Sequence, residues 1–161
     1  MKRKETLYLT RGALICALYV ALTYVSSAFG LASGVIQVRL SEALVMLVIL
    51  MPEAVVGVTL GCFIANLLTG AVIWDVIFGT LATLIGAVIG RLLRRLPTRL
   101  IWLASIPTVL SNAIIVPFVL IYAYGVPDAY YYIMATVALG EIISATLLGT
   151  VLYLSLKKLR I

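Results

Sequence analysis

The stretch Gln37-Val38-Arg39-Leu40-Ser41-Glu42 places an arginine and a glutamate three residues apart at the start of a strongly apolar segment. On a helix, residues three apart share a face, so Arg39 and Glu42 can neutralise each other. Ionisable groups at membrane depth are costly and by default mark a site or a pathway. The stretch therefore predicts either a polar site or an ion pair that only caps a short helix at the membrane interface.

The chain around this stretch is too apolar for a water-soluble domain. Of its 161 residues, 64% are hydrophobic and 11% are charged, and the mean hydropathy is +1.21, whereas soluble domains carry about 25% charged residues. Each segment is apolar on all sides rather than in alternation, which indicates helices and not a β-barrel. We expect an all-α integral membrane protein with a single domain over residues 1–161.

The basic residues indicate topology rather than a nucleic-acid partner. The chain carries twelve basic and six acidic residues, for a net charge of +6. All basic residues except Arg39 fall into three clusters that flank apolar segments, at residues 2–11, 91–99 and 157–160. Short cytoplasmic loops of membrane proteins collect Lys and Arg in this way. We therefore expect contact with membrane lipid and none with nucleic acid.

Six apolar spans follow one another, at about residues 7–28, 40–51, 54–68, 76–93, 100–124 and 131–156. Six crossings return every basic cluster to the cytoplasm, so we predict a six-transmembrane-helix bundle with both termini cytoplasmic. The second and third spans reach only about 18–22 Å, less than the ~30 Å hydrocarbon core. Irregular backbone at membrane depth must line a cavity or be buried. We therefore expect the loop at residues 30–38 to dip into the membrane and cover a cavity.

Polar residues gather in the outer half of this predicted bundle, while the inner half is nearly bare. They are Arg39, Glu42, Asn66, Asp75, Asn112 and Glu141. This distribution predicts a polar pocket that opens outward. Asp75 could instead cap a helix, the two asparagines could instead join helices, and Trp74 could be an interfacial anchor or stack on a planar ligand. Glu141, near mid-membrane, needs a partner or a ligand.

Small residues recur at every fourth position in three spans. Ala13, Ala17 and Ala21 lie in the first, Gly57 and Gly61 in the third, and Gly86 and Gly90 in the fourth. Such spacing lets helix backbones approach closely in lipid, so packing within the bundle is the default interpretation. The alanine stripe also suits docking on another membrane subunit, because it faces outward if the other spans fill the bundle.

Groups that catalysis requires are missing from the sequence. It has no histidine, no Gly-x-x-x-x-Gly-Lys-Ser/Thr phosphate loop, no metal-ligand cluster and no serine nucleophile with a base. Its two cysteines, Cys16 and Cys62, both lie in apolar spans. We therefore expect no enzymatic activity, no cofactor and no metal. Any energy for transport has to come from partner subunits.

Five stretches in order along the chain resemble the queuosine-precursor transporter (QueT) family, which consists of substrate-capturing S components of energy-coupling factor (ECF) transporters. They are residues 37–44 (QVRLSEAL), 57–66 (GVTLGCFIAN), 75–84 (DVIFGTLATL), 111–117 (SNAIIVP) and 137–141 (VALGE). The alanine stripe resembles the motif by which S components dock on a transmembrane coupling subunit. The loop at residues 125–128 is not matched to the family.

The resemblance implies a membrane subunit of a bacterial plasma membrane that binds a 7-deazaguanine base from outside. Import would need a transmembrane coupling subunit and two ATPases. In the site it implies, Glu141 accepts the two adjacent N–H donors of a guanine-like edge, and Asp75 or Glu42 binds an aminomethyl cation if one is present. The implied roles of the remaining residues are base-edge contacts by Asn66 and Asn112 and ring stacking by Trp74 or Tyr122.

Two other functions remain open at this point. An S component for another vitamin or nucleobase, such as a flavin or a pyrimidine, would share the fold and the alanine stripe. A small facilitator or a structural membrane subunit is the second alternative. A facilitator should carry polar residues through to the inner side, and a structural subunit has no need of a mid-membrane glutamate. Which queuosine precursor is carried does not follow from the sequence.

Overall fold

The computed structural model describes residues 3–31 and 37–159, which are helical with no strand among them. Its elements are α1 (Arg3–Ala28), η1 (Leu40–Ile49), α2 (Glu53–Leu68), α3 (Ile73–Leu92), η2 (Leu93–Arg95), η3 (Thr98–Ser105), α4 (Ile106–Tyr122), α5 (Tyr130–Glu141), η4 (Ile142–Leu148) and α6 (Gly149–Lys158). Several of these run on without a break. Four continuous helices are long and apolar enough to cross a membrane, at Lys4–Ala28, Ile73–Arg95, Thr98–Tyr122 and Tyr130–Lys158. The two shorter apolar helices are η1 and α2.

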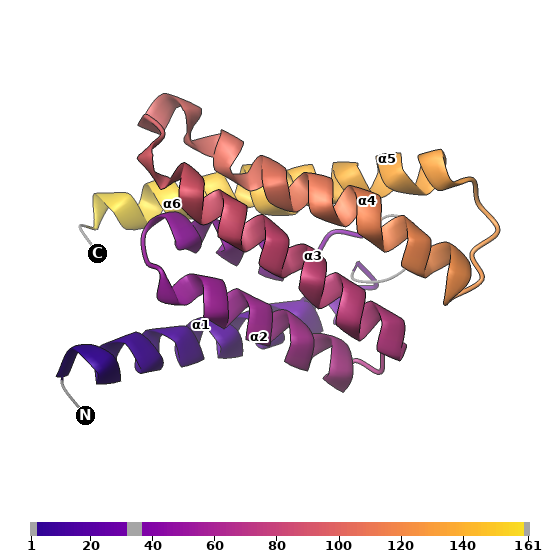
Figure 1. Ribbon diagram of the computed structural model, residues 1–161, viewed down its shortest axis with the longest axis horizontal. Coiled ribbons are helices and arrows are strands. Elements are labelled where there is room, and N and C mark those ends of the chain that lie inside the picture. Colours follow the sequence, from indigo (N-terminus) through magenta and orange to yellow (C-terminus); the bar gives the residue numbers. More distant parts are fainter. Residues whose placement is uncertain (1–2, 32–36, 160–161) are drawn as a thin grey trace.

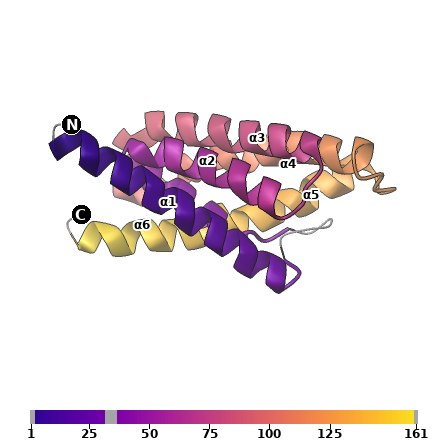
Figure 2. The ribbon, with the colours of Figure 1, turned by 90° about the horizontal axis from the view of Figure 1, so that it is seen from below.

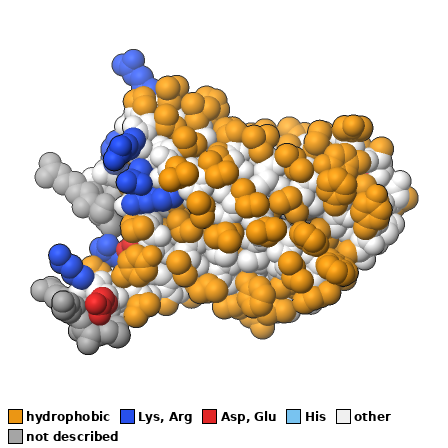
Figure 3. Space-filling model, viewed as in Figure 1, with side chains coloured by type: hydrophobic (Ala, Val, Ile, Leu, Met, Phe, Trp, Pro, Cys, Tyr) orange, Lys and Arg blue, Asp and Glu red, His pale blue; other side chains and the backbone are white. Residues whose placement is uncertain are grey.

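The long helices lie side by side, and both described ends of the chain lie at one end of the bundle (Figures 1 and 2). In chain order, α1 packs on α2, α2 on α3, α3 on α4 and α4 on α5. Lysine and arginine side chains gather at the end that carries the termini, and the rest of the visible face is largely hydrophobic (Figure 3). The grouping of basic clusters at one end of the bundle is confirmed. The number of crossings and the orientation of the termini remain predictions.

The short helix η1 forms the centre of the bundle. Residues 41–49 are all buried, because α1, α2, α3, η4 and α6 pack around it. It is a 3-10 helix over ten residues. At about 2.0 Å per residue it reaches about 20 Å, rather than the roughly 15 Å of an α-helix of that length. The 3-10 geometry of η1 therefore supplies part of the length by which the second predicted span falls short of the hydrocarbon core.

Arg91 binds the C-terminal end of η1. Its Nη1 donates hydrogen bonds to the carbonyl oxygens of Val48 and Ile49 at 2.8 and 2.9 Å. The last carbonyls of a helix lack intrahelical partners, and a cation suits their negative end. The sequence places Arg91 in a basic cytoplasmic cluster, but its side chain reaches inward to stabilise a buried helix.

Glycines allow the close contacts that the sequence predicts. A Cβ at Gly57 would lie 2.8 Å from the Gly12 carbonyl oxygen, and one at Gly61 would lie 2.6 Å from the Cβ of Tyr19. A side chain at either position would push α1 away from α2, so both glycines are packing residues, as predicted. Ala13, Ala17 and Ala21 lie on the exposed side of α1, as the outward-facing stripe requires.

Two expectations about the ends of the bundle need comment. The half of the bundle near the termini contains more buried polar groups than predicted: Glu53 is buried and forms an ion pair of 3.5 Å with the exposed Arg11, and Ser105 is fully buried. Glu53 opens α2, where a carboxylate is favoured by the helix dipole. Residues 32–36 of the expected covering loop lie outside the described residues. At its edges, the Val38 N–H donates to the Leu31 carbonyl oxygen at 2.8 Å.

Candidate functional site

A polar cavity of about 550 Å³ lies at the end of the bundle opposite the termini. Its walls come from the end of α1, the segment before η1, the turn between α2 and α3, and the residues that follow α4. Three of the predicted site residues line it, namely Arg39, Asn66 and Asp75. Because these residues come from three separate parts of the chain, the fold is what assembles the site.

A chain of contacts connects the polar residues of the wall. Arg39 Nη1 lies 3.5 Å from Asn66 Oδ1, and Asn66 Nδ2 lies 3.4 Å from the carbonyl oxygen of Asp75. Asp75 is also the carboxylate that attracts the Arg39 guanidinium most strongly. Asp75 lies in the first turn of α3, but the N-cap residue is Val72 and no side chain caps the helix, so the capping interpretation is not borne out.

The Tyr124 hydroxyl forms hydrogen bonds with both Asp75 and Val72, and so connects the segment after α4 to the start of α3. It donates to Asp75 Oδ2 at 3.0 Å and accepts from the Val72 N–H at 3.2 Å. Partial burial and the neighbouring Asp75 carboxylate raise the pKa of the Tyr124 phenol, so its proton remains available for this bond at neutral pH. The residues after α4 are thereby fixed to the start of α3, at the rim of the cavity.

Glu42 and Glu141 form a second, deeper group beside the cavity. They are 2% and 8% exposed, and each interacts electrostatically with Arg39 and with the other. The Tyr19 hydroxyl donates to Glu42 Oε1. Among the described residues, Oε2 of Glu42 and Oε2 of Glu141 have no hydrogen-bond partner. Buried carboxylate oxygens without donors are costly, so this group is suited to receive a donor from a ligand.

The segment before η1 separates this group from the cavity. Gln37 lines the cavity, and its backbone lies so close to Gly140 that any side chain at position 140 would collide with it. Thr23 also lines the cavity and donates to Ser41 Oγ at 2.9 Å. The residues of the cavity wall therefore contact the sequence neighbours of both glutamates, Gly140 and Ser41. The π-helix η4 begins directly after Glu141, and such segments are frequent at functional sites.

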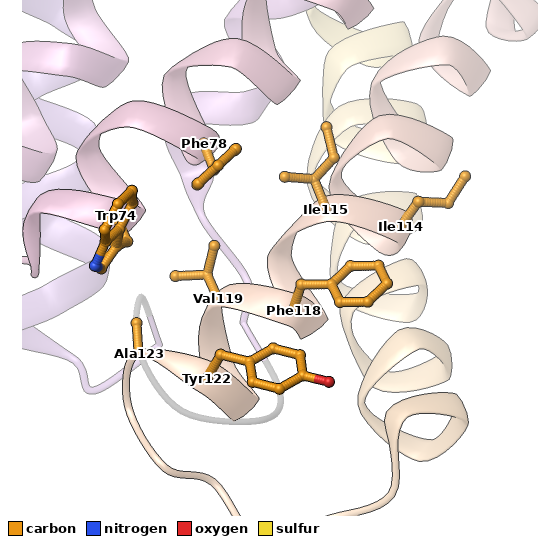
Figure 4. A pocket seen from close by; sticks show the side chains of 8 residues that line it. All are labelled: Trp74, Phe78, Ile114, Ile115, Phe118, Val119, Tyr122 and Ala123. Carbon is orange, nitrogen blue, oxygen red and sulfur yellow. The ribbon is translucent and has the colours of Figure 1, made fainter.

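Trp74 and Tyr122 lie elsewhere. They line a separate apolar hollow of about 410 Å³ between α3 and α4, together with Phe78, Phe118 and neighbouring aliphatic side chains (Figure 4). Their side chains are 55% and 82% exposed. The structure therefore does not bring the two predicted stacking residues together with Arg39, Asn66 and Asp75.

Asn112 also lies outside the lining of the polar cavity. It is buried on α4, where its Nδ2 donates to the carbonyl oxygen of Thr108 one turn earlier at 3.1 Å. This bond lies within one helix, so it does not join helices as the alternative interpretation predicted.

Sequence reasoning missed several residues of the site, namely Tyr19, Thr23, Gln37, Ser41 and Tyr124. Tyr19 and Thr23 had a detectable pattern. With Ile15 and Ser26 they form the buried face of α1, at spacings of three and four residues. The exposed alanine stripe lies on the other side of the same helix. Tyr124, in contrast, follows α4 in an irregular segment, where hydropathy and periodicity carry no information.

The chain was compared with known proteins. A family model described as QueT transporter matches residues 9–158, nearly the whole chain. The Queuosine precursor transporter QueT of Lactococcus lactis subsp. cremoris (strain MG1363) is 37% identical over 93 residues, which cover 58% of this chain and 54% of that protein. The match thus spans about half the length of this relative. No solved structure matches the chain significantly.

Proposed function

The chain belongs to the QueT transporter family, and on this premise we propose that it is the substrate-binding S component of an ECF-type importer for a 7-deazaguanine precursor of queuosine. The observation that carries the proposal is the polar cavity with buried carboxylates beside it, inside helices whose outer faces are apolar. Polar groups enclosed in this way are costly to maintain in a membrane and favour a ligand site. No enzymatic step is part of the proposed role.

The proposed topology has six crossings, with η1 and α2 as the two short ones. Both described ends of the chain and the basic turn at η2 lie at one end of the bundle (Figure 1). Because short basic loops stay in the cytoplasm, this end faces inward and the polar cavity opens to the outside. The cavity thus lies on the side from which a bacterial cell takes up its substrate across the plasma membrane.

Glu141 is our choice for the recognition of the base. A guanine-like edge presents two adjacent N–H donors, and a desolvated carboxylate accepts both at once. Glu141 is 8% exposed and retains a buried oxygen without a donor in the described part of the chain. Asn66, which lies in the cavity wall, supplies a donor and an acceptor for the rest of the base. Asp75 or Glu42 would bind any cationic substituent of the base.

The energy for import would come from two ATPases, through a coupling subunit that docks on α1. Ala13, Ala17 and Ala21 border an apolar groove of about 650 Å³ between α1 and α2, which Gly12 and Gly57 also line. Small side chains let a partner helix approach the backbone closely. The groove is exposed on the outer face of the bundle, so docking there leaves the polar cavity free.

Uptake by proteoliposomes tests this function. We expect radiolabelled 7-deazaguanine bases to accumulate only when the chain is reconstituted with its coupling subunit, both ATPases and ATP. Ala17→Trp should abolish uptake and preserve substrate binding, because it blocks the groove alone. Val88→Trp, on an exposed part of α3, is the matched control and should retain uptake. Accumulation by the chain alone would instead make it a facilitator.

A further inference from the structure

The buried polar group next to the cavity contains more acidic than basic side chains. Among the described residues it contains one cation, Arg39, and three carboxylates, Glu42, Asp75 and Glu141. All three carboxylates are at least nine-tenths buried. Inside a bundle of apolar helices, an uncompensated charge is far more costly than at a surface. The group is therefore balanced only when it takes up positive charge or protons.

Asp75 already has its partners. Its Oδ2 accepts a hydrogen bond from Tyr124 at 3.0 Å, and the Arg39 guanidinium attracts it electrostatically. Glu42 differs, because only its Oε1 has a donor, the Tyr19 hydroxyl. Its Oε2 is buried and has no partner within the described residues, and the same is true of Glu141 Oε2. The buried carboxylate oxygens that lack a donor are thus on Glu42 and Glu141.

A protonated amine supplies the hydrogen-bond donor that the buried Oε2 atoms of these two carboxylates lack. It is compact, carries one positive charge and offers three N–H donors, with charge-assisted bonds about 2.7–2.9 Å long. Thr23 lines the cavity and donates a hydrogen bond to Ser41, the residue before Glu42. Arg39 also lines the cavity and attracts Glu42 electrostatically. Glu42 lies behind this wall, so a ring bound in the cavity would need an arm that extends past the wall to reach it.

We propose that Glu42 binds a protonated amine of the substrate, so that the chain selects 7-deazaguanine bases with an amine arm over neutral ones. This inference rests on the function proposed above and adds the charge of the substrate to it. It also assigns the cation to Glu42 rather than to Asp75, whose Oδ2 already accepts a hydrogen bond from Tyr124. Glu141 contacts the base edge that charged and neutral precursors share, so its loss weakens both.

Calorimetric titration of the purified chain at neutral pH with 7-aminomethyl-7-deazaguanine and 7-cyano-7-deazaguanine tests this assignment. The two probes share the ring and differ in charge. We expect the aminomethyl base to bind at least tenfold more tightly. Glu42→Gln, which keeps the shape and the Tyr19 contact, should remove most of this preference. Asp75→Asn should weaken both probes alike and keep the preference, and the exposed Asp128→Asn should change neither.

Several results would overturn the inference. The first is a nitrile that binds the wild-type chain as tightly as the aminomethyl base, which would mean that protons neutralise the carboxylates; the proposed function would then stand. The second is a preference that survives Glu42→Gln or disappears in Asp75→Asn. Because the wild-type ratio alone can contradict the inference, the test does not depend on the folding of a variant. If neither probe binds, the proposed function itself fails.

Discussion

At the scale of single residues, Tyr19 is the hydrogen-bond donor on which the buried Glu42 depends. We expect Tyr19→Phe to lower the free energy of unfolding by about 1–3 kcal/mol, because it leaves a buried carboxylate without its donor. Unfolding of the purified chain in mixed micelles with increasing SDS measures this change. Tyr8→Phe, at an exposed position on the same helix, is the control. Equal stability of the two variants would contradict the importance of the Tyr19 bond.

The residue scale also shows what the sequence could and could not predict about the site. Charges and amides in apolar segments are visible in any sequence, so Arg39, Asn66, Asp75, Glu42 and Glu141 were identified, and the structure places them in or beside one cavity. Trp74 and Tyr122 were chosen for their chemistry alone, and they line another hollow. The direction in which an aromatic side chain points depends on helix rotation, which hydropathy does not define when all faces are apolar.

At the scale of elements, the C-terminal end of η1 depends on Arg91. We expect Arg91→Met to lower the free energy of unfolding by about 2–4 kcal/mol, because two hydrogen bonds from a charged donor to buried carbonyls are lost. Arg94→Met, at an exposed position one turn later, removes the same charge and should cost much less. Both variants are compared by SDS titration. Equal losses would attribute the effect to net charge rather than to η1.

The close contact between α5 and the segment before η1 yields a second prediction at this scale. Gly140→Ala should displace Gln37, because the new methyl group would collide with its backbone. We expect weaker substrate binding by at least tenfold, since Gln37 lines the polar cavity. Calorimetry with a 7-deazaguanine base measures the loss. In the control Gly12→Ala the new Cβ meets its nearest atom at an ordinary 3.6 Å. Unchanged binding by Gly140→Ala would show that the segment does not shape the site.

Element positions followed from hydropathy, but their helix types did not. The predicted spans 40–51 and 54–68 agree with η1 and α2 within a few residues. That η1 is a 3-10 helix, and that η4 is a π-helix after Glu141, depends on hydrogen-bond register. A change of hydrogen-bond register rotates the following side chains by a fraction of a turn. A segment that is apolar on every side has no hydrophobic periodicity, so its sequence does not reveal such a rotation.

At the scale of the whole molecule, the proposed topology places the loop after α4 outside and the basic turn at η2 inside. In a chain without Cys16 and Cys62, a membrane-impermeant maleimide should label Asp128→Cys on intact cells. It should label Arg95→Cys only after the membrane is permeabilised. Both positions are exposed, so a difference in labelling reports the side of the membrane. Labelling of both on intact cells, or the reverse order, would contradict the orientation.

The grouping of basic clusters at one end was predictable, since it follows from charge and from the number of spans. The enclosure of η1 by its neighbours was not, because nothing in its composition distinguishes a central helix from a lipid-facing one. Residues 41–49 read as one more apolar span, yet they form the core around which the others pack. Whether η1 is buried depends on how all the other helices pack. A single sequence does not show which apolar helix faces contact each other.

The central claim is that the isolated chain binds a 7-deazaguanine base in its polar cavity, and a calorimetric titration of the purified chain without any partner subunit tests it most directly. We predict one binding site with a Kd in the low micromolar range or below, which Glu141→Ala abolishes and Asp128→Ala leaves unchanged. Absence of binding by the folded wild-type chain, or equal binding by Glu141→Ala, would contradict the account.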